Sequence, residues 1–209
     1  MMGRMSQVTC DLTISLDGFV AGPNQTPADP LGDNGELLHR WMFEEPEPNA
    51  AAIEGILAAG AFIMGRNMYA GPGEWAEEWR GWWGEEPPYH APVFVLTHHP
   101  REPVPMLGGT TFNFVTDGIE SALAQAREAA GSKDIAIAGG AQTARQYLSA
   151  GLIDELRLHI APIVLGVGER LLDGVENLSL EPTEVSGSRL VTHVRYRVNR
   201  DNAAGGAKQ

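Results

Sequence analysis

Two segments of this sequence share one pattern, an apolar strand that runs directly into glycine and then into a helix. The first covers residues 62–69 and the second residues 135–143. Glycine at such a junction lets backbone N–H groups approach a ligand closely, and the helix start behind it carries unpaired donors and a partial positive charge. Each junction therefore has the features of a phosphate-binding site. Two in one domain indicate a ligand with several phosphates, such as a nucleotide cofactor.

The order of the predicted elements indicates an α/β fold. Strands alternate with helices as far as Gly151, and residues 155–165, 179–185 and 190–198 are then strand-like without helices between them. This order predicts one layered domain over residues 1–198, with a mixed sheet and an antiparallel edge. Residues 199–209 are polar and lack apolar anchors, so we expect a disordered tail.

Composition excludes several classes of protein. A formal charge of −12 over 209 residues, without any Lys/Arg-rich run, argues against binding to nucleic acid. No run approaches the roughly 20 apolar residues that span a bilayer, so we expect no membrane partner. Cys10 is the single cysteine, which excludes an internal disulfide and a zinc site built on paired cysteines. We expect no metal site and a cytoplasmic location.

Arg66, which follows the glycine of the first junction, has two interpretations. Arg66 in the first helical turn adds a guanidinium to the backbone donors, as phosphate or carboxylate binding would require. It is equally a surface arginine paired with one of the many acids. Thr97 and His98 end a predicted strand, where α/β proteins bind ligands, although exposed turn residues look the same.

A tryptophan-rich segment over residues 71–88 is open to three interpretations. Trp75, Trp79, Trp82 and Trp83 have helical spacing, which favours an amphipathic cover over the core. The same residues are also compatible with the lining of a substrate pocket or with a dimer surface.

Three segments together resemble the dihydrofolate reductase family, in the branch that includes the reductase domain of bacterial riboflavin biosynthesis proteins. They are Ile-Ser-Leu-Asp-Gly-Phe-Val-Ala-Gly at residues 14–22, Ile-Met-Gly-Arg-Asn-Met-Tyr at 63–69, and the stretch from Ile-Ala-Gly-Gly-Ala at 137–141 to Gly-Glu at 168–169. Their order and spacing match across roughly residues 8 to 198. The resemblance implies a three-layer αβα fold whose mixed sheet has a mostly parallel core and antiparallel C-terminal strands.

The resemblance also implies NADPH as the cofactor and assigns residues to it. The residues that would contact the cofactor are Val20, Ala21, Gly65, Arg66, Asn67, Met68, Thr97, His98, Gly139, Gly140, Ala141, Gln142 and Thr143. Among these, Thr97 and His98 fall where the family holds the adenosine 2′-phosphate. Val20 and Ala21 would lie nearest to the nicotinamide.

The proton donor is where the chain departs from the family. Dihydrofolate reductases place an acid on the first helix, and alignment on Trp41 puts Leu38 at that position. Asp17 is the first candidate to replace it, Glu36 and then Asp33 follow, and an ordered water is a further alternative. An Asp-Gly pair is also a common turn, which gives Asp17 a purely structural interpretation.

These features predict an NADPH-dependent reductase that transfers hydride to a small heterocyclic (pterin- or pyrimidine-like) or carbonyl substrate. Two alternatives stay open. One is a reductase that uses a flavin or deazaflavin carrier, because a phosphate-binding site does not show which redox-active ring the cofactor carries. The other is a nucleotide-binding or sensor protein without turnover. By the same resemblance we expect a homodimer, which would cover the strand-rich C-terminal edge.

Overall fold

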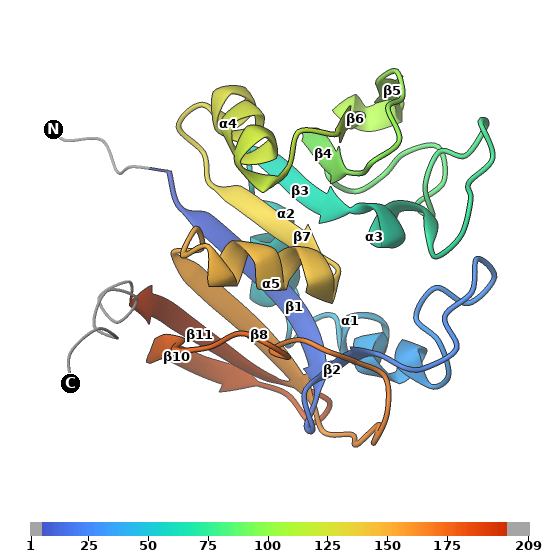
Figure 1. The fold of residues 1–209 in the computed structure, drawn as a ribbon. Helices are drawn as coiled ribbons and strands as arrows, with labels where there is room; N and C mark the ends of the chain where they lie inside the picture. The colour runs from blue at the N-terminus through green and yellow to red at the C-terminus, as the bar shows by residue number, and fades with distance from the viewer. Residues whose placement is uncertain (1–5, 200–209) are drawn as a thin grey trace, which may run out of the picture.

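A nine-stranded mixed sheet forms the centre of the protein in the computed structural model, which describes residues 6–199 (Figure 1). Its strands, in spatial order, are β10 (Ser179–Gly187), β11 (Thr192–Asn199), β8 (Glu155–Ala161), β1 (Val8–Ser15), β7 (Ile135–Gly139), β3 (Ala61–Gly65), β4 (Pro92–Leu96), β6 (Thr111–Val115) and β5 (Val104–Pro105). The six strands from β8 to β6 run parallel, while β10, β11 and β5 are antiparallel to their neighbours. The predicted mixed sheet with a parallel core and an antiparallel C-terminal end is confirmed.

Helices cover both faces of this sheet and complete the three layers. On one face α4 (Ile119–Ala130) and α5 (Ala141–Ser149) pack against β3, β4 and β7. On the other face lie the 3-10 helix η1 (Gly35–His39) and the helices α1 (Arg40–Glu44) and α2 (Ala50–Leu57). The alternation of β1 explains this arrangement, because Val8 and Cys10 point into the α4–α5 core while Thr9 and Asp11 point to the opposite face.

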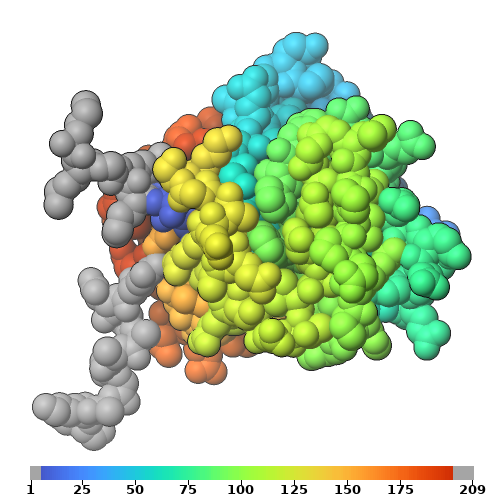
Figure 2. All heavy atoms as spheres, turned by 90° about the horizontal axis from the view of Figure 1, so that it is seen from above, coloured from blue at the N-terminus to red at the C-terminus, as the bar shows by residue number. Residues whose placement is uncertain are grey.

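The tryptophan-rich segment is not helical, so the predicted amphipathic helix is wrong. It follows the short helix α3 (Arg66–Ala70) as loops and turns, with positive φ at Gly71, Gly73, Gly81 and Gly84 that a helix does not accommodate. The predicted cover over the core is nevertheless found, because Trp75, Trp79 and Trp83 pack against a second apolar cluster around Tyr69 and Phe112. Viewed from above, this teal segment and the orange and red C-terminal strands lie at opposite ends of the molecule (Figure 2).

The N-terminal extended segment is divided into two strands. It ends as β1 at Ser15, turns at Asp17-Gly18 and resumes as β2 (Phe19–Ala21). Gly18 has φ +88 and provides this turn. The short strand β2 pairs with β9 (Glu169–Arg170) outside the main sheet. Two distant parts of the chain, residues 15–21 and 163–172, are thereby joined beside the ends of the parallel strands.

The edge strand β10 is exposed along most of its length. It carries Pro182 and a register shift between Pro182 and Glu184, both of which limit pairing with a further strand. The expected homodimer stays a prediction. The expected disordered tail begins at Asn199, which belongs to β11, and residues 200–209 lie outside the described part of the chain. Among residues 6–199 no helix has the length and apolar character needed to cross a bilayer.

Candidate functional site

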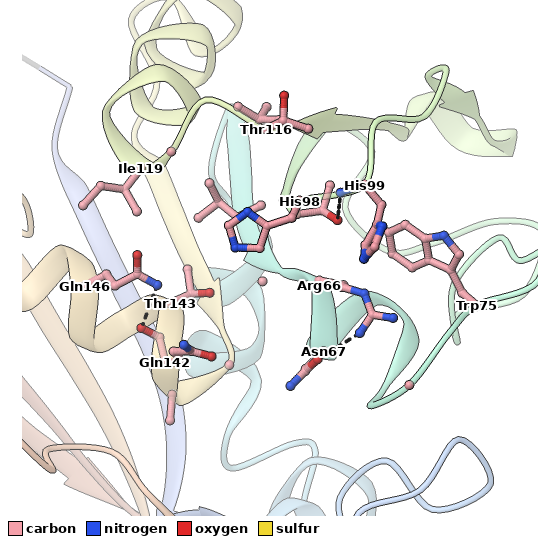
Figure 3. Close-up of a pocket in the computed structure, with 18 of the residues that line it drawn as sticks. Arg66, Asn67, Trp75, His98, His99, Thr116, Ile119, Gln142, Thr143 and Gln146 are labelled. Atoms are coloured by element: carbon pink, nitrogen blue, oxygen red, sulfur yellow. Dashed lines mark hydrogen bonds between the residues drawn. The ribbon is translucent and has the colours of Figure 1, made fainter.

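A cavity of about 840 Å³ opens at the carboxyl ends of β3, β4, β6 and β7 (Figure 3). This is the end of a parallel sheet at which α/β proteins bind ligands, and the volume is ample for a drug-sized molecule. Its lining comprises Gly65, Arg66, Asn67, Gly73, Glu74, Trp75, Leu96, Thr97, His98, His99, Val115, Thr116, Gly118, Ile119, Gly140, Ala141, Gln142, Thr143, Gln146 and Glu169.

Three strand–glycine–helix junctions meet at this cavity, one more than the sequence indicated. The junctions β3–α3 and β7–α5 are the expected two. The third is β6–α4, where Gly118 is the residue before the helix and has φ +90. The N-cap position of α4 belongs to Gly118 and not to Asp117, and it has no side-chain hydrogen bond.

The physical reason for glycine differs from one position of these junctions to the next. A Cβ added to Gly65 would overlap with Oγ1 of Thr143, so the two expected junctions pack directly against each other. Gly139 has φ +125, a conformation that favours glycine. Gly140 has neither constraint: no atom lies within 4 Å of an added Cβ, which would project into open space. The bare backbone at Gly140 therefore leaves room for a ligand at the start of α5.

Arg66 provides the arginine of the cavity. Its Nη1 donates two long hydrogen bonds of 3.4 Å, to Oδ1 of Asn67 and to the carbonyl of Gly71. Its Nε is buried without a hydrogen-bond partner, and no carboxylate of residues 6–199 lies within ion-pair distance of it. The alternative of a surface arginine paired with an acid is therefore wrong. A buried cationic donor without a partner beside a cavity is compatible with an anionic ligand.

Most of the residues assigned to a cofactor lie together in this cavity. Nine of them line it: Gly65, Arg66, Asn67, Thr97, His98, Gly140, Ala141, Gln142 and Thr143. Gly139 and Met68 lie just below, with an added Cβ of Gly139 only 3.3 Å from Sδ of Met68. Val20 and Ala21 on β2 are not part of the lining, and Ala21 is buried beneath Gly168. Their expected contact with a nicotinamide stays a prediction.

Sequence reasoning missed several residues of the lining. Trp75 and His99 stand beside Arg66, and Gln146 lies on the opposite side, on α5 (Figure 3). Glu169 also lines the cavity, with Oε1 3.7 Å from Nη2 of Arg145 on α5. Trp75 was recognisable only as one of four tryptophans, because nothing local distinguishes it from the three that do not line the cavity. Gln146 follows Gln142 by one helical turn, a spacing that could have indicated it.

Asp17 lies outside the cavity, and its carboxylate fastens two loops together. It accepts hydrogen bonds from Oγ of Ser15 at 2.6 Å and from the backbone N–H groups of Leu165 and Gly166 at 3.1 and 2.7 Å. These bonds, that from Ser15 first, lower the pKa of Asp17 to about 2. A carboxylate that is ionised at neutral pH has no proton to donate, so this geometry argues for the turn interpretation and against general acid catalysis.

Glu36 and Asp33, the next candidates for the proton donor, are also outside the lining. Glu36 is exposed on η1, and Asp33 accepts a hydrogen bond from Nδ2 of Asn24. The carboxylates that line the cavity within residues 6–199 are instead Glu74 and Glu169. Glu169 lies 3.7 Å from Arg145 of α5. A catalytic role for Glu36 stays a prediction.

Comparison with known proteins adds a family to this geometry. Residues 6–193 match the family model of the RibD C-terminal domain. The uncharacterized protein YyaP of Bacillus subtilis (strain 168) is 25% identical over 200 residues, which covers 92% of this chain and 96% of YyaP.

Solved structures show the same fold at low sequence identity. A Shewanella sp. PV-4 protein, assigned by inference to riboflavin biosynthesis, is 24% identical with a TM-score of 0.64, over 93% of this chain and 99% of that one. A pyrimidine reductase-like protein from Corynebacterium diphtheriae is 17% identical with a TM-score of 0.57, over 94% and 93%. A Thermotoga maritima deaminase/reductase has 14% identity and a TM-score of 0.58, over 94% of this chain and 57% of that one.

The resemblance found in three sequence segments thus extends over the whole folded part of the chain. The sheet order, the helices on both faces and the cavity at the strand ends all agree with a dihydrofolate reductase-like reductase domain. The chain belongs to the RibD C-terminal domain family.

Proposed function

We propose that this protein is an NADPH-dependent reductase that transfers hydride to a small heterocyclic, pyrimidine- or pterin-like, or carbonyl substrate. The observation that carries the proposal is the convergence of three strand–glycine–helix junctions and the unpaired Arg66 on one cavity. Membership of a family named after a riboflavin biosynthesis protein supports it, as do the pyrimidine-reductase names of the structural neighbours.

The residues present fit a dinucleotide with separate anionic groups. The open space at Gly140 and the start of α5 suit a pyrophosphate, because backbone N–H groups there face the cavity with no side chain in the way. Arg66, Thr97 and His98 offer donors at the other end for the phosphate on the adenosine ribose. NADPH bound there supplies the hydride, while the protein orients the reacting groups and excludes water.

The two loops that Asp17 holds together would help to position the substrate. The turn at residues 15–18 and the segment 163–168 lie next to β9, whose Glu169 reaches the cavity. A fixed wall at this end would keep the substrate in register with the cofactor, a task that needs rigidity and no proton.

Removal of the Arg66 side chain tests the anion site. Arg66→Ala should weaken NADPH binding by about 1.5–3 kcal/mol, because a charge-assisted hydrogen bond is lost. Titration of the protein with NADPH, followed by cofactor fluorescence, measures the dissociation constant. Arg127→Ala, an exposed arginine of α4 outside the cavity, is the matched control and should bind like the parent. An unchanged dissociation constant for Arg66→Ala would remove Arg66 from the site.

Turnover separates the proposed reductase from its alternatives. Loss of NADPH absorbance with a panel of pterins, folates, pyrimidines and quinones should identify at least one acceptor. Tight NADPH binding without oxidation by any acceptor would instead indicate a nucleotide-binding sensor. Binding of a flavin or deazaflavin in preference to NADPH would indicate a different carrier.

A further inference from the structure

The guanidinium of the partly buried Arg66 lies against an aromatic ring and has no acidic partner among residues 6–199. Its Cζ lies 5.1 Å from the ring centroid of Trp75, within the range of a cation–π interaction. Both side chains line the cavity, and Figure 3 shows them together with His99, on the side opposite Gln142 and Gln146. Trp75 is thus the large side chain that lies against Arg66.

The Trp75 ring is itself held by the second apolar cluster. Tyr69 and Phe114 meet it edge-on, with ring centroids at 5.4 and 5.6 Å. The guanidinium of Arg101 lies 6.0 Å from the same ring, and Arg101 also donates hydrogen bonds to the hydroxyl of Tyr69 and to the carbonyl of Glu77. These contacts come from α3, β6 and the loop after β4, so they fix a segment that has no regular structure of its own.

A cation–π contact and a salt bridge differ in how far they offset the charge of an arginine and in whether they occupy its hydrogen-bond donors. An acid would offset the charge of the guanidinium and occupy its N–H groups, whereas a ring within cation–π distance accepts no conventional hydrogen bond from them. In a chain with a formal charge of −12, an arginine without an acidic partner is a local positive centre. The structure therefore leaves the charge of Arg66 without an acidic partner among residues 6–199, and Nη1 makes only two long hydrogen bonds, to Asn67 and Gly71.

We propose that Trp75 is a positioning residue of the anion site: it holds the Arg66 guanidinium toward the cavity, ready for the ribose phosphate that distinguishes NADPH from NADH. The inference rests on the proposed function and assigns a task to the tryptophan-rich segment. Arg66 and His99 lie beside Trp75, on the side of the cavity away from Gln142 and Gln146 at the start of α5, and Thr97 and His98 line the same cavity. Trp75 acts through Arg66, so its effect should appear with the extra phosphate and vanish without it.

Two substitutions of Trp75 test this, measured as dissociation constants for NADPH and for NADH. Trp75→Leu should raise the NADPH constant roughly five- to twentyfold, because the cation–π support is lost, and should change the NADH constant less than about twofold. Trp75→Phe should lie between parent and Trp75→Leu, since a benzene ring retains part of the interaction. Trp83→Phe is the matched control, because Trp83 stacks on Phe112 in the same cluster but does not line the cavity.

A double-variant cycle shows whether the effect passes through Arg66. In the Arg66→Ala background, Trp75→Leu should add less than about twofold to the NADPH constant. Equal losses for NADPH and NADH, or a full Trp75→Leu effect without Arg66, would overturn the inference and leave Trp75 as a wall of the cavity. A parent protein that binds neither dinucleotide would overturn the proposed function along with it. Circular dichroism and thermal melting verify the fold, and Trp75→Phe keeps the test decisive if Trp75→Leu does not fold.

Discussion

Individual side chains in this protein do tasks that their residue types alone do not reveal. Arg66 and Asp17 illustrate this, because both were candidates for the site, Arg66 from the glycine junction and Asp17 from the family resemblance. The arginine is found in the cavity with unfilled donors, whereas the carboxylate is saturated by Ser15 and two backbone N–H groups. What separates them is the number of hydrogen-bond partners that the rest of the fold provides.

The fastening role of Asp17 leads to a prediction for Asp17→Asn. An amide presents only one acceptor oxygen and places an NH₂ group against a backbone donor, so the segment around Leu165 and Gly166 should loosen. Hydrogen exchange at these two amides should accelerate and the melting temperature should fall. Hydride transfer should become less efficient with its pH profile unchanged.

A proton donor would behave differently from a fastener. If Asp17 supplied the proton, Asp17→Asn would abolish turnover at every pH, whereas loss of a structural carboxylate should only reduce it. Asp33→Asn is the control, since the Asp33 carboxylate accepts its hydrogen bond from Asn24 in an exposed loop outside the cavity lining.

At the scale of elements, the site depends on how closely two helix starts approach each other. The β3–α3 and β7–α5 junctions touch through Gly65 and Thr143, which puts two sets of backbone donors on one cavity. Parallel strands β3 and β7 are neighbours in the sheet, so their carboxyl ends necessarily lie side by side. The distance between the helix starts then follows from the missing Cβ at Gly65.

Gly65→Ala should therefore destabilise the protein by about 1–3 kcal/mol, as overpacking does, and weaken NADPH binding. The added methyl group overlaps Oγ1 of Thr143, while the φ of −80 at Gly65 suits alanine, so the cost is steric alone. Chemical denaturation measures it. Thr143→Ala removes the overlapping atom, and the double variant should be more stable than the sum of the two single changes predicts. Strictly additive losses would show that this contact does not set the spacing.

At the scale of the whole molecule, the sheet face that α2 covers is divided into two parts. It is apolar over β3 and β4 and polar over β1, β8 and β11. Around β1, β8 and β11 this face buries a chain of polar groups. The Nδ1 atoms of His159 and His193 are 2.7 Å apart, and Nε2 of His193 donates to Oδ1 of Asn49 at 2.9 Å. Asn49 uses its NH₂ on the carbonyl of Glu45, which fixes this direction. Nε2 of His159 lies 3.8 Å from Oδ1 of Asp11.

This histidine pair predicts a loss of stability in mild acid. Two Nδ1 atoms at this distance share one proton, so both rings cannot be charged. Burial, followed by the charges of His159 and Arg195, lowers the pKa of His193 from 6.5 to about 4. Between these pH values His193 is protonated in the unfolded state and neutral in the folded state. The free energy of unfolding therefore falls as the pH decreases from about 6.5 to about 4. Burial lowers the pKa of His39 as well, which adds in the same direction.

Thermal melting between pH 7.5 and 5 measures this dependence, which should amount to a few degrees. His193→Gln keeps a donor for Asn49 but cannot be protonated, so its melting temperature should vary less over that range. An equal slope in parent and variant would locate the titrating group elsewhere.

The sequence alone determined the α/β class, the two glycine junctions and nine of the residues that line the cavity. These follow from periodicity and from glycine at strand ends, which are local signals. The third junction at Gly118, the place of Trp75 under Arg66 and the fastening task of Asp17 were decided only by the tertiary structure. Each depends on segments distant in the chain, such as Trp75 against Phe114 or Asp17 against Gly166, and no local pattern records which of four tryptophans or which of several acids will meet its partner.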